Sequence, residues 1–182
     1  MRIPEEKKFD KLALLLDTLA FNQVIIFANR IERAQKLTSL LKVKLFNPIC
    51  IHSGLRQEER IKCYDQFKAN CSRLLVATDL FGRGIDIERV NLVINYDFPP
   101  DRDTYLHRVG RAGRFNTRGL AVNFLRAEGE DDQVLIDVQN GFKVKIEEMP
   151  NEIDPVKYKW YLLCFILIIT IKYKREAFII VN

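Results

Sequence analysis

Metal-binding patterns are missing from this sequence. Only two of its 182 residues are histidine, and the four cysteines show neither a C-x-x-C pair nor a Cys/His ligand spacing. We therefore expect free thiols in a reducing compartment, no disulfide and no bound metal. The first ten residues carry acidic side chains and no apolar core, which argues against a secretory or mitochondrial leader.

Phosphate-binding loops of the common kinds are missing as well. No G-x-x-x-x-G-K-[ST] loop occurs, and the G-x-G of GRGIDI has no third glycine at the dinucleotide spacing. An enzyme that cleaves nucleoside triphosphates needs such a loop to cradle the phosphates, and a carboxylate to hold magnesium. The sequence therefore excludes a Rossmann site and a self-sufficient P-loop enzyme.

What is present is the composition of an ordinary folded protein. Apolar residues make up 48% and charged residues 29% of the chain, and its length suits one domain with or without an appendage. Lys and Arg exceed Asp and Glu by five, an excess that permits a polyanionic partner without requiring one.

Helical and strand patterns alternate along most of the chain. From Glu5 to Leu19 the apolar residues recur every three or four positions, which predicts an amphipathic helix. Short apolar runs rich in β-branched residues then alternate with further helical patterns, which predicts an α/β fold: a parallel sheet with helices on both faces, in three layers. The expected strands are 23–28, 48–52, 73–78, 90–97 and 119–125, with a possible edge strand at 143–148, and the further helices are 30–42, 56–70, 103–114 and 130–142.

The composition changes after Asp154-Pro155. We expect a domain over 1–154 and an apolar extension of unknown role over 155–182. Its apolar run of about a dozen residues is shorter than the roughly 20 that a membrane-spanning helix needs, so no stable membrane association is expected. A membrane anchor, a buried or aggregation-prone extension, and sequence foreign to the domain remain the alternatives.

An arginine-rich segment, YLHRVGRAGRFNTRG, runs from Tyr105 to Gly119. On a helix, Arg108, Arg111 and Arg114 would share one broad face, and we expect this segment to gather with other polar signals at the carboxyl edge of the sheet. A guanidinium donates up to five hydrogen bonds in a planar fork that matches phosphate oxygens, and glycines let phosphate come close. Such a face is suited to contacting a phosphate that is held by something else. The alternative is a helix face that is simply exposed to solvent.

Four segments in order resemble motifs of the DEAD-box RNA helicases. HRVGRAGR at His107–Arg114 resembles motif VI, RLLVATDLFGRGIDI at Arg73–Ile87 resembles motif V, VIIFANR at Val24–Arg30 resembles motif IV, and QEER matches the Q-x-x-R element. The resemblance implies the second, C-terminal RecA-like domain of such a helicase, a fold related to the P-loop NTPases. Gly82 and the closing DVQNGFKVKIEEMPNEID resemble the splicing and mRNA-export subgroup, the DECD variant.

The resemblance also implies residue roles. Arg111 and Arg114 correspond to arginine fingers, and His107 corresponds to the residue that couples the nucleotide site to the facing domain. Taken singly, Asp86 could simply cap a turn, Thr78-Asp79 could start a helix, and Gln57 and Arg60 could be an exposed first turn. The implied nucleotide contacts are Asp86, Gly84 and Arg83, and the implied RNA contacts are Asn29, Gly54, Gln57, Arg60 and Thr78.

Two further side-chain types are expected to be structural. The aromatic residues Phe98, Tyr105 and Phe115 could be mistaken for platforms on which bases stack. No motif supports that role, so we expect them to pack in the core. His52 is expected to support the glycine turn beside it.

These patterns lead to one preferred hypothesis and two alternatives. In the preferred hypothesis the chain is the C-terminal half of an ATP-dependent RNA helicase and is inactive alone, because ATP and Mg²⁺ are held mainly by the missing N-terminal domain. Its expected partners are RNA, that domain and mRNA-export proteins, and we expect a nuclear monomer. The alternatives are a non-enzymatic RNA- or helicase-binding module, and a DNA-remodelling helicase domain, which is disfavoured because its arginine segment does not normally follow YLHR.

Overall fold

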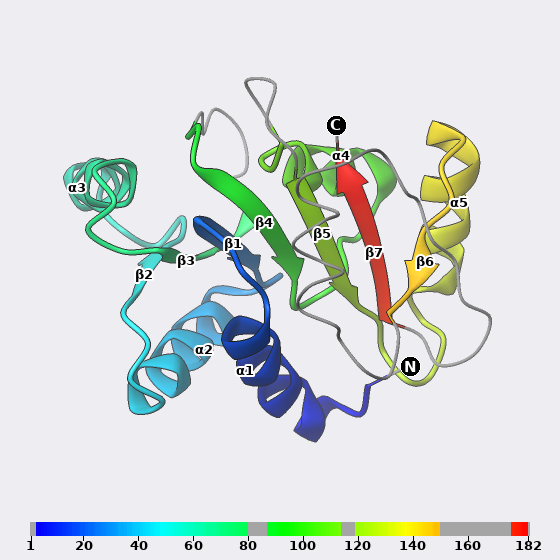
Figure 1. Cartoon of the computed structure of the whole chain (residues 1–182), viewed down its shortest axis with the longest axis horizontal. Helices are drawn as coiled ribbons and strands as arrows, with labels where there is room; N and C mark the ends of the chain where they lie inside the picture. The colour runs from blue at the N-terminus through cyan, green and yellow to red at the C-terminus, as the bar shows by residue number, and fades with distance from the viewer. Residues whose placement is uncertain (1–2, 80–86, 114–118, 150–175, 182) are drawn as a thin grey trace.

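Helices and strands alternate in the computed structural model of the chain, which describes residues 3–79, 87–113, 119–149 and 176–181 (Figure 1). The order of elements follows the predicted alternation, and most boundaries lie within three residues of the predicted ones. The elements are η1 Glu5–Lys7, α1 Lys8–Thr18, β1 Gln23–Phe27, α2 Ile31–Val43, β2 Pro48–Ile51, α3 Gln57–Lys68, β3 Leu74–Ala77, β4 Val90–Asn95, α4 Arg102–Val109, β5 Gly119–Phe124, α5 Asp132–Phe142, β6 Glu147–Glu148 and β7 Glu176–Val181.

One sheet runs through the molecule in the strand order β2-β3-β1-β4-β5-β7-β6. The first five strands are parallel, which confirms the predicted α/β fold. β7 runs antiparallel between β5 and β6, with Gly119 opposite Val181 and Phe124 opposite Glu176 (Figure 1). The sequence analysis did not predict this strand, which comes from the 155–182 segment. The expected strand over 143–148 is reduced to Glu147–Glu148, which pairs with β7.

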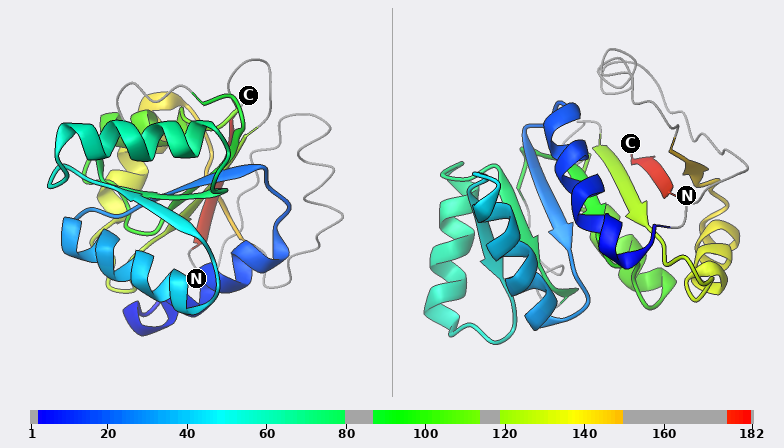
Figure 2. Two further views of the ribbon diagram at one scale, coloured as in Figure 1. Left: turned by 90° about the vertical axis from the view of Figure 1, so that its left-hand side faces the viewer. Right: turned by 90° about the horizontal axis from the view of Figure 1, so that it is seen from below.

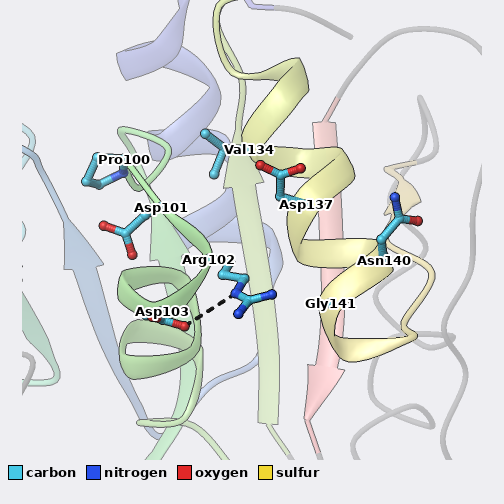
Figure 3. Close-up of a pocket in the computed structure, with 8 residues that line it drawn as sticks. All are labelled: Pro100, Asp101, Arg102, Asp103, Val134, Asp137, Asn140 and Gly141. Atoms are coloured by element: carbon cyan, nitrogen blue, oxygen red, sulfur yellow. Dashed lines mark ion pairs between the residues drawn. The ribbon is translucent and has the colours of Figure 1, made fainter.

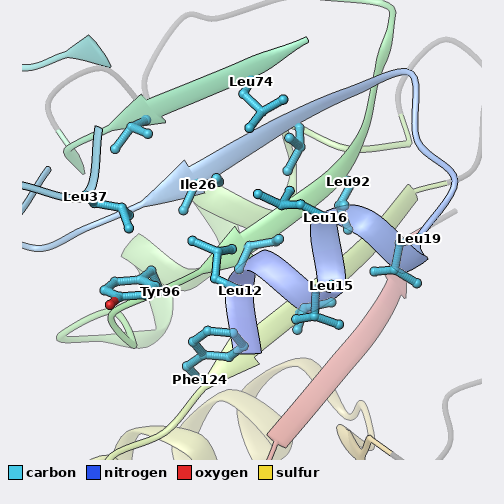
Figure 4. Packing of buried hydrophobic residues seen from close by; sticks show 14 of the residues in the cluster. Leu12, Leu15, Leu16, Leu19, Ile26, Leu37, Leu74, Leu92, Tyr96 and Phe124 are labelled. Carbon is cyan, nitrogen blue, oxygen red and sulfur yellow. The ribbon is translucent and has the colours of Figure 1, made fainter. Parts of the chain in front are cut away.

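The sheet is buried on both faces, as parallel sheets are. Along β1 the side chains alternate: Val24 and Ile26 pack towards α1 and α2, while Ile25 and Phe27 pack towards α3, α4 and α5. The left view of Figure 2 shows α3 on one side of the strands and α1 with α2 on the other. Figure 4 shows how three leucines of α1, Leu12, Leu15 and Leu16, meet the first face of the sheet. The buried side chains thus form two cores, one on each face of the sheet. Packing in these cores holds the strands in place, and with them the loops that follow the strands.

Helix α4 is shorter than predicted. It begins at Arg102 and ends at Val109 rather than at 114. Its N-cap is Asp101, whose carboxylate accepts from the Thr104 N–H at 2.7 Å and from the Thr104 hydroxyl at 2.8 Å. After Gly110 the chain turns, and Gly113 adopts φ 73°, a conformation that suits glycine. The prediction that the arginines share one helix face is therefore wrong: Arg108 is fully buried, whereas Arg111 lies beyond the helix and is half-buried.

Two observations bear on the remaining expectations. Within the described ranges, none of the helices combines the length and apolarity needed to cross a membrane. Cys50, Cys63 and Cys71 are free thiols, and the part of the chain that the structure describes contains no group of three His, Cys, Asp or Glu residues placed to hold a metal ion.

Candidate functional site

Polar residues gather where β3, β1 and β4 end, three strands that lie side by side in the sheet. Asn29 follows β1, Asp79 follows β3, and Asn95 and Asp97 lie at the end of β4. Ligands of open α/β sheets bind beyond the carboxyl ends of the strands, so this edge is the first place to look for a site.

Arg108 of α4 is the centre of this polar group. Its side chain is among the largest that are fully buried, and its guanidinium lies 5.2 Å from the ring centroid of Phe27. Asp79 accepts two of its hydrogen bonds, from Nε at 2.5 Å and from Nη2 at 2.7 Å. Three more bonds run from Nη2 to Asn29 Oδ1 (2.6 Å), and from Nη1 to the Asp97 carbonyl oxygen (2.8 Å) and Asn95 Oδ1 (3.3 Å).

Asn29, one of the predicted RNA contacts, is held from three directions. Its backbone N–H donates to Asp97 Oδ2 at 3.0 Å, and its side-chain Nδ2 donates to the Phe98 carbonyl oxygen at 2.9 Å. Its Oδ1 accepts from Arg108. The residue is exposed, but both polar ends of its amide already have partners within the protein.

A second ionic cluster adjoins Asn29. Arg33 Nε lies 2.6 Å from both carboxylate oxygens of Asp97, and Arg33 also pairs with Glu5. The Lys8 ammonium, almost fully buried, lies 3.2 Å from Glu5. Partial burial opposes ionisation of Glu5, but its bonds to Arg33 and Lys8 outweigh this and lower its pKa. A pocket of about 390 Å³ is lined by this cluster; its residues are Glu5, Lys8, Asn29, Arg30, Arg33, Asp97, Phe98 and Arg126.

The predicted RNA contacts Gly54, Gln57 and Arg60 lie between β2 and the first turn of α3. Arg60 Nη2 donates to Gln57 Oε1, so these two side chains meet on one exposed turn. A Cβ on the exposed Gly54 would lie 3.2 Å from Nδ1 of His52, which is 5% exposed and packs beneath it. The expected supporting role of His52 agrees with this position.

Thr78 connects this turn to the rest of the edge. Its N–H donates to the Ile51 carbonyl oxygen at 3.3 Å, which ties the end of β3 to the end of β2. The Thr78 residue is 6% exposed. Together with Asn29 and Asp79 it completes a row of loop residues along the carboxyl ends of β2, β3 and β1.

His107 and Arg111 lie at the other end of α4. His107 is exposed, and Arg111 Nε donates to the His107 carbonyl oxygen at 3.0 Å. The Gly113 N–H donates to the carbonyl oxygen of Val90, the first residue of β4, at 3.4 Å. The expectation that the whole arginine segment lies at the carboxyl edge is therefore wrong, because its end returns to the amino end of β4. Arg83, Gly84, Asp86 and Arg114 lie outside the described residues.

The aromatic residues near the site are packing residues, as expected. Phe98 and Tyr105 are buried with their ring centroids 5.8 Å apart, and Phe115 lies outside the described residues. Burial raises the pKa of Tyr105, whose hydroxyl oxygen accepts from Asn123 Nδ2 at 3.3 Å. Asn123 in turn accepts from Asn95, so α4 is connected to β4 a second time.

A larger pocket, of about 620 Å³, lies between the start of α4 and helix α5 (Figure 3). It contains an ion pair between Arg102 and Asp103 at 3.6 Å. None of the predicted site residues lines it, so we do not assign the site there. The lining residues are Pro100, Asp101, Arg102, Asp103, Val134, Asp137, Asn140 and Gly141.

Comparison with known proteins decides the family. The profile of the helicase conserved C-terminal domain matches residues 7–116. The chain belongs to this family. The helicase domain is 56% identical over 158 residues to the ATP-dependent RNA helicase uap56 of Schizosaccharomyces pombe and 53% identical over 158 residues to human DDX39A. Each alignment covers 87% of this chain, but 36% and 37% of the relatives, so the domain spans about a third of their length.

Solved structures agree with this assignment. The helicase domain matches the C-terminal domain of the DEAD-box protein Dbp5 with a TM-score of 0.69 and 34% identity, over 76% of this chain and 80% of that one. It also matches Saccharomyces cerevisiae Dbp5 bound to RNA and ADP BeF3, with a TM-score of 0.72 and 34% identity, over 76% of this chain and 37% of that one. The predicted resemblance to DEAD-box RNA helicases, and to the subgroup of uap56, SUB2 and DDX39A, is confirmed.

The sequence analysis missed the central residue of the helicase domain's polar edge. It assigned Arg108 to an exposed face with Arg111, and it gave Asp79 and Asp97 no role. A signal was available, because Tyr105, Val109 and Ala112 recur at helical spacing and mark a buried stripe in which Arg108 falls. For the cluster around Lys8 and Arg33 the sequence offers no local signal, since its members are far apart along the chain.

Proposed function

We propose that this domain is one of two halves of an ATP-dependent RNA helicase, acting in pre-mRNA splicing and mRNA export. The observation that supports it most is the set of bonds around Arg108, which joins the loops after β1 and β3 to the helix that carries His107. Segments that resemble motifs IV, V and VI thereby form one connected structure. In this function the half closes against an N-terminal RecA-like domain over ATP and RNA.

The RNA-facing part is the row of loops along β2, β3 and β1. Gly54 offers backbone without a Cβ, Gln57 and Arg60 offer hydrogen-bond donors, and Thr78 offers a hydroxyl. Such groups grip phosphates and sugars and fix the strand in place without reading bases. RNA binding by this half is therefore independent of sequence.

The nucleotide-facing part consists of His107, Arg111 and Arg114, with Asp86, Gly84 and Arg83 at the ribose. Arginines that reach a transferring phosphoryl group accelerate its transfer about 10³- to 10⁵-fold by stabilising charge. ATP and Mg²⁺ are held mainly by the N-terminal domain, because this sequence has no P-loop. His107 couples the two domains when they meet.

The test is ATP hydrolysis by the purified chain at saturating RNA. We expect no measurable turnover by the chain alone, and RNA-dependent turnover once the N-terminal domain of the Schizosaccharomyces pombe relative is added or fused to it. Robust hydrolysis by the chain alone would refute the assignment.

A second candidate function is a non-enzymatic module that binds RNA or a helicase partner. In that case the exposed turn with Gly54, Gln57 and Arg60 would serve binding alone. The upstream part of the transcript decides between the two, because an open reading frame that encodes a P-loop and an acidic box restores the enzyme.

By resemblance to the same subgroup we also propose a nuclear monomer that contacts mRNA-export proteins, with 155–182 as an extension of the 1–154 domain.

A further inference from the structure

The guanidinium of Arg108 uses all of its donors in hydrogen bonds within the protein. A guanidinium has five N–H groups, and Arg108 makes five hydrogen bonds, to Asp79 (two), Asn29, Asn95 and the Asp97 carbonyl. The side chain is 1% exposed, so water has almost no access to replace a lost partner. If the loop after β1, β3 or β4 is displaced, either a buried charge-assisted bond breaks or the Arg108 side chain moves with the loop.

Arg108 connects two groups of residues that are far apart along the chain. On one side are the loops after β3 and β1, which carry Thr78 and Asn29. On the other side is α4 itself, where His107 precedes Arg108 and accepts through its carbonyl oxygen from Arg111 Nε. The carboxyl ends of two strands are thus linked to His107 and Arg111 through a single buried side chain.

We propose that Arg108 is a positioning residue that transmits RNA binding at the β1 and β3 loops to His107 and Arg111. Asn29 has a matching role: since both ends of its amide are engaged within the protein, it holds the β1 loop to Arg108 and contributes to RNA binding by position. This inference rests on the proposed function, because it takes the loops to be the RNA-facing part.

Lysine cannot substitute for arginine in this position. An ammonium carries one charge and three donors around a single nitrogen, so it cannot span the two Asp79 oxygens and three further acceptors in one plane. Arg108→Lys therefore keeps the charge that Asp79 requires and removes the connection among the loops. The variant separates a positioning role from simple charge neutralisation.

The two histidines of the chain make the test direct. A sample labelled in histidine gives two ring signals in NMR, one from His52 and one from His107, which His107→Gln assigns. The probe is single-stranded oligouridine, added to saturation so that differences in affinity do not enter. We expect RNA to shift the His107 signal in the unmodified chain, and expect Arg108→Lys to reduce that shift to less than half.

Two controls keep the outcome interpretable. Arg89→Lys changes an exposed arginine at the amino end of β4 and is expected to leave the shift as it is. If Arg108→Lys does not fold, as its thermal melt would reveal, Asn29→Ala is measured instead, since it removes one acceptor from an exposed position and is expected to weaken the same shift.

The outcomes are distinct. Failure of the unmodified chain to bind oligouridine contradicts the proposed function and this inference together. Binding without a His107 shift overturns the inference alone, and so does a shift that persists at full size in Arg108→Lys or, where that variant is unfolded, in Asn29→Ala. Loss of the shift in the variant, with Arg89→Lys unaffected, supports it.

Discussion

Arg108 and Arg111 stand three residues apart in one motif, yet the structure places them in opposite environments. Arg108 is fully buried and makes five bonds to four residues that lie at the end of β4 or in the loops after β1, β3 and β4. Arg111 lies past the end of α4, is half-buried, and donates to its own segment at the His107 carbonyl oxygen. One arginine is therefore part of the protein's interior, and the other lies half-buried in the turn that follows the helix.

The difference arises from the periodicity of α4. Tyr105 and Val109 form the buried stripe of α4, and Arg108 lies in that stripe next to Val109. Arg111 does not continue the helix, because the chain turns after Gly110. Residue type alone thus does not separate a fully buried arginine from a half-buried one; the buried stripe of the helix and the point where the helix ends do.

Arg108→Ala is the substitution for which we expect the largest loss of unfolding free energy. It leaves Asp79 without its counter-charge, and removing one partner of a buried ion pair typically costs about 3–5 kcal/mol of unfolding free energy. Since the Asp79 side chain is 36% exposed, we expect the lower end of that range. Urea denaturation measures it, with Arg111→Ala as the matched comparison, for which we expect a smaller loss because Arg111 is only half-buried. Equal losses in the two variants would contradict the contrast between the two arginines.

Asn29→Ala tests one of the five hydrogen bonds that Arg108 makes. The variant leaves one buried Nη2 donor without its acceptor, and an unsatisfied buried donor costs about 1–3 kcal/mol. The same denaturation experiment applies, and Asn140→Ala, at an exposed asparagine of α5, is the control. A variant as stable as the unmodified chain would show that Arg108 does not depend on this bond.

Asp101 caps the start of α4, the helix that carries Arg108, so replacing it tests how far the stability of the protein depends on that helix. Asp101→Ala removes the N-cap and is expected to cost about 1 kcal/mol. The bond from the Thr104 N–H lowers the pKa of Asp101 below its ordinary 3.8. A lowered pKa in the folded state means that this stabilisation is present above pH 3.8 and is lost as the pH falls through the folded value.

Asp101→Asn separates the cap from its charge. Asparagine also caps helices, so this variant keeps most of the stability at neutral pH and loses the pH dependence. The difference in unfolding free energy between the unmodified chain and the Asp101→Asn variant should shrink as the pH falls below about 4, where the Asp101 carboxylate begins to take up its proton. A difference that stays constant throughout an acid titration would mean that the capping carboxylate does not titrate with folding.

Much of the fold was predictable because its signals are local. The apolar runs that became β1, β3 and β5 and the leucine spacing of α1 each lie within a short window, and the two cores then follow from their alternation. The end of α4 was not predictable in this way. Gly113 turns back to bond with Val90, a contact that depends on the assembled sheet.

The site was only partly predictable for the same reason. Motif-bearing residues such as Thr78 and His107 could be named because each lies in a contiguous segment. The burial of Arg108, the engagement of Asn29 and the insertion of β7 beside β5 depend on residues tens of positions away. Long-range packing decides those features, and no pattern within one segment reports it.

The most direct measurement of the central claim is ATP turnover by this chain fused to the N-terminal domain of the Schizosaccharomyces pombe relative, at saturating RNA and ATP. Replacing Arg111 with alanine is expected to lower the turnover number about 10³-fold or more while leaving the thermal melt in place. If the Arg111→Ala fusion hydrolysed ATP as fast as the unmodified one, this half would not be supplying charge to the triphosphate, and the proposed division of labour between the two halves would be wrong.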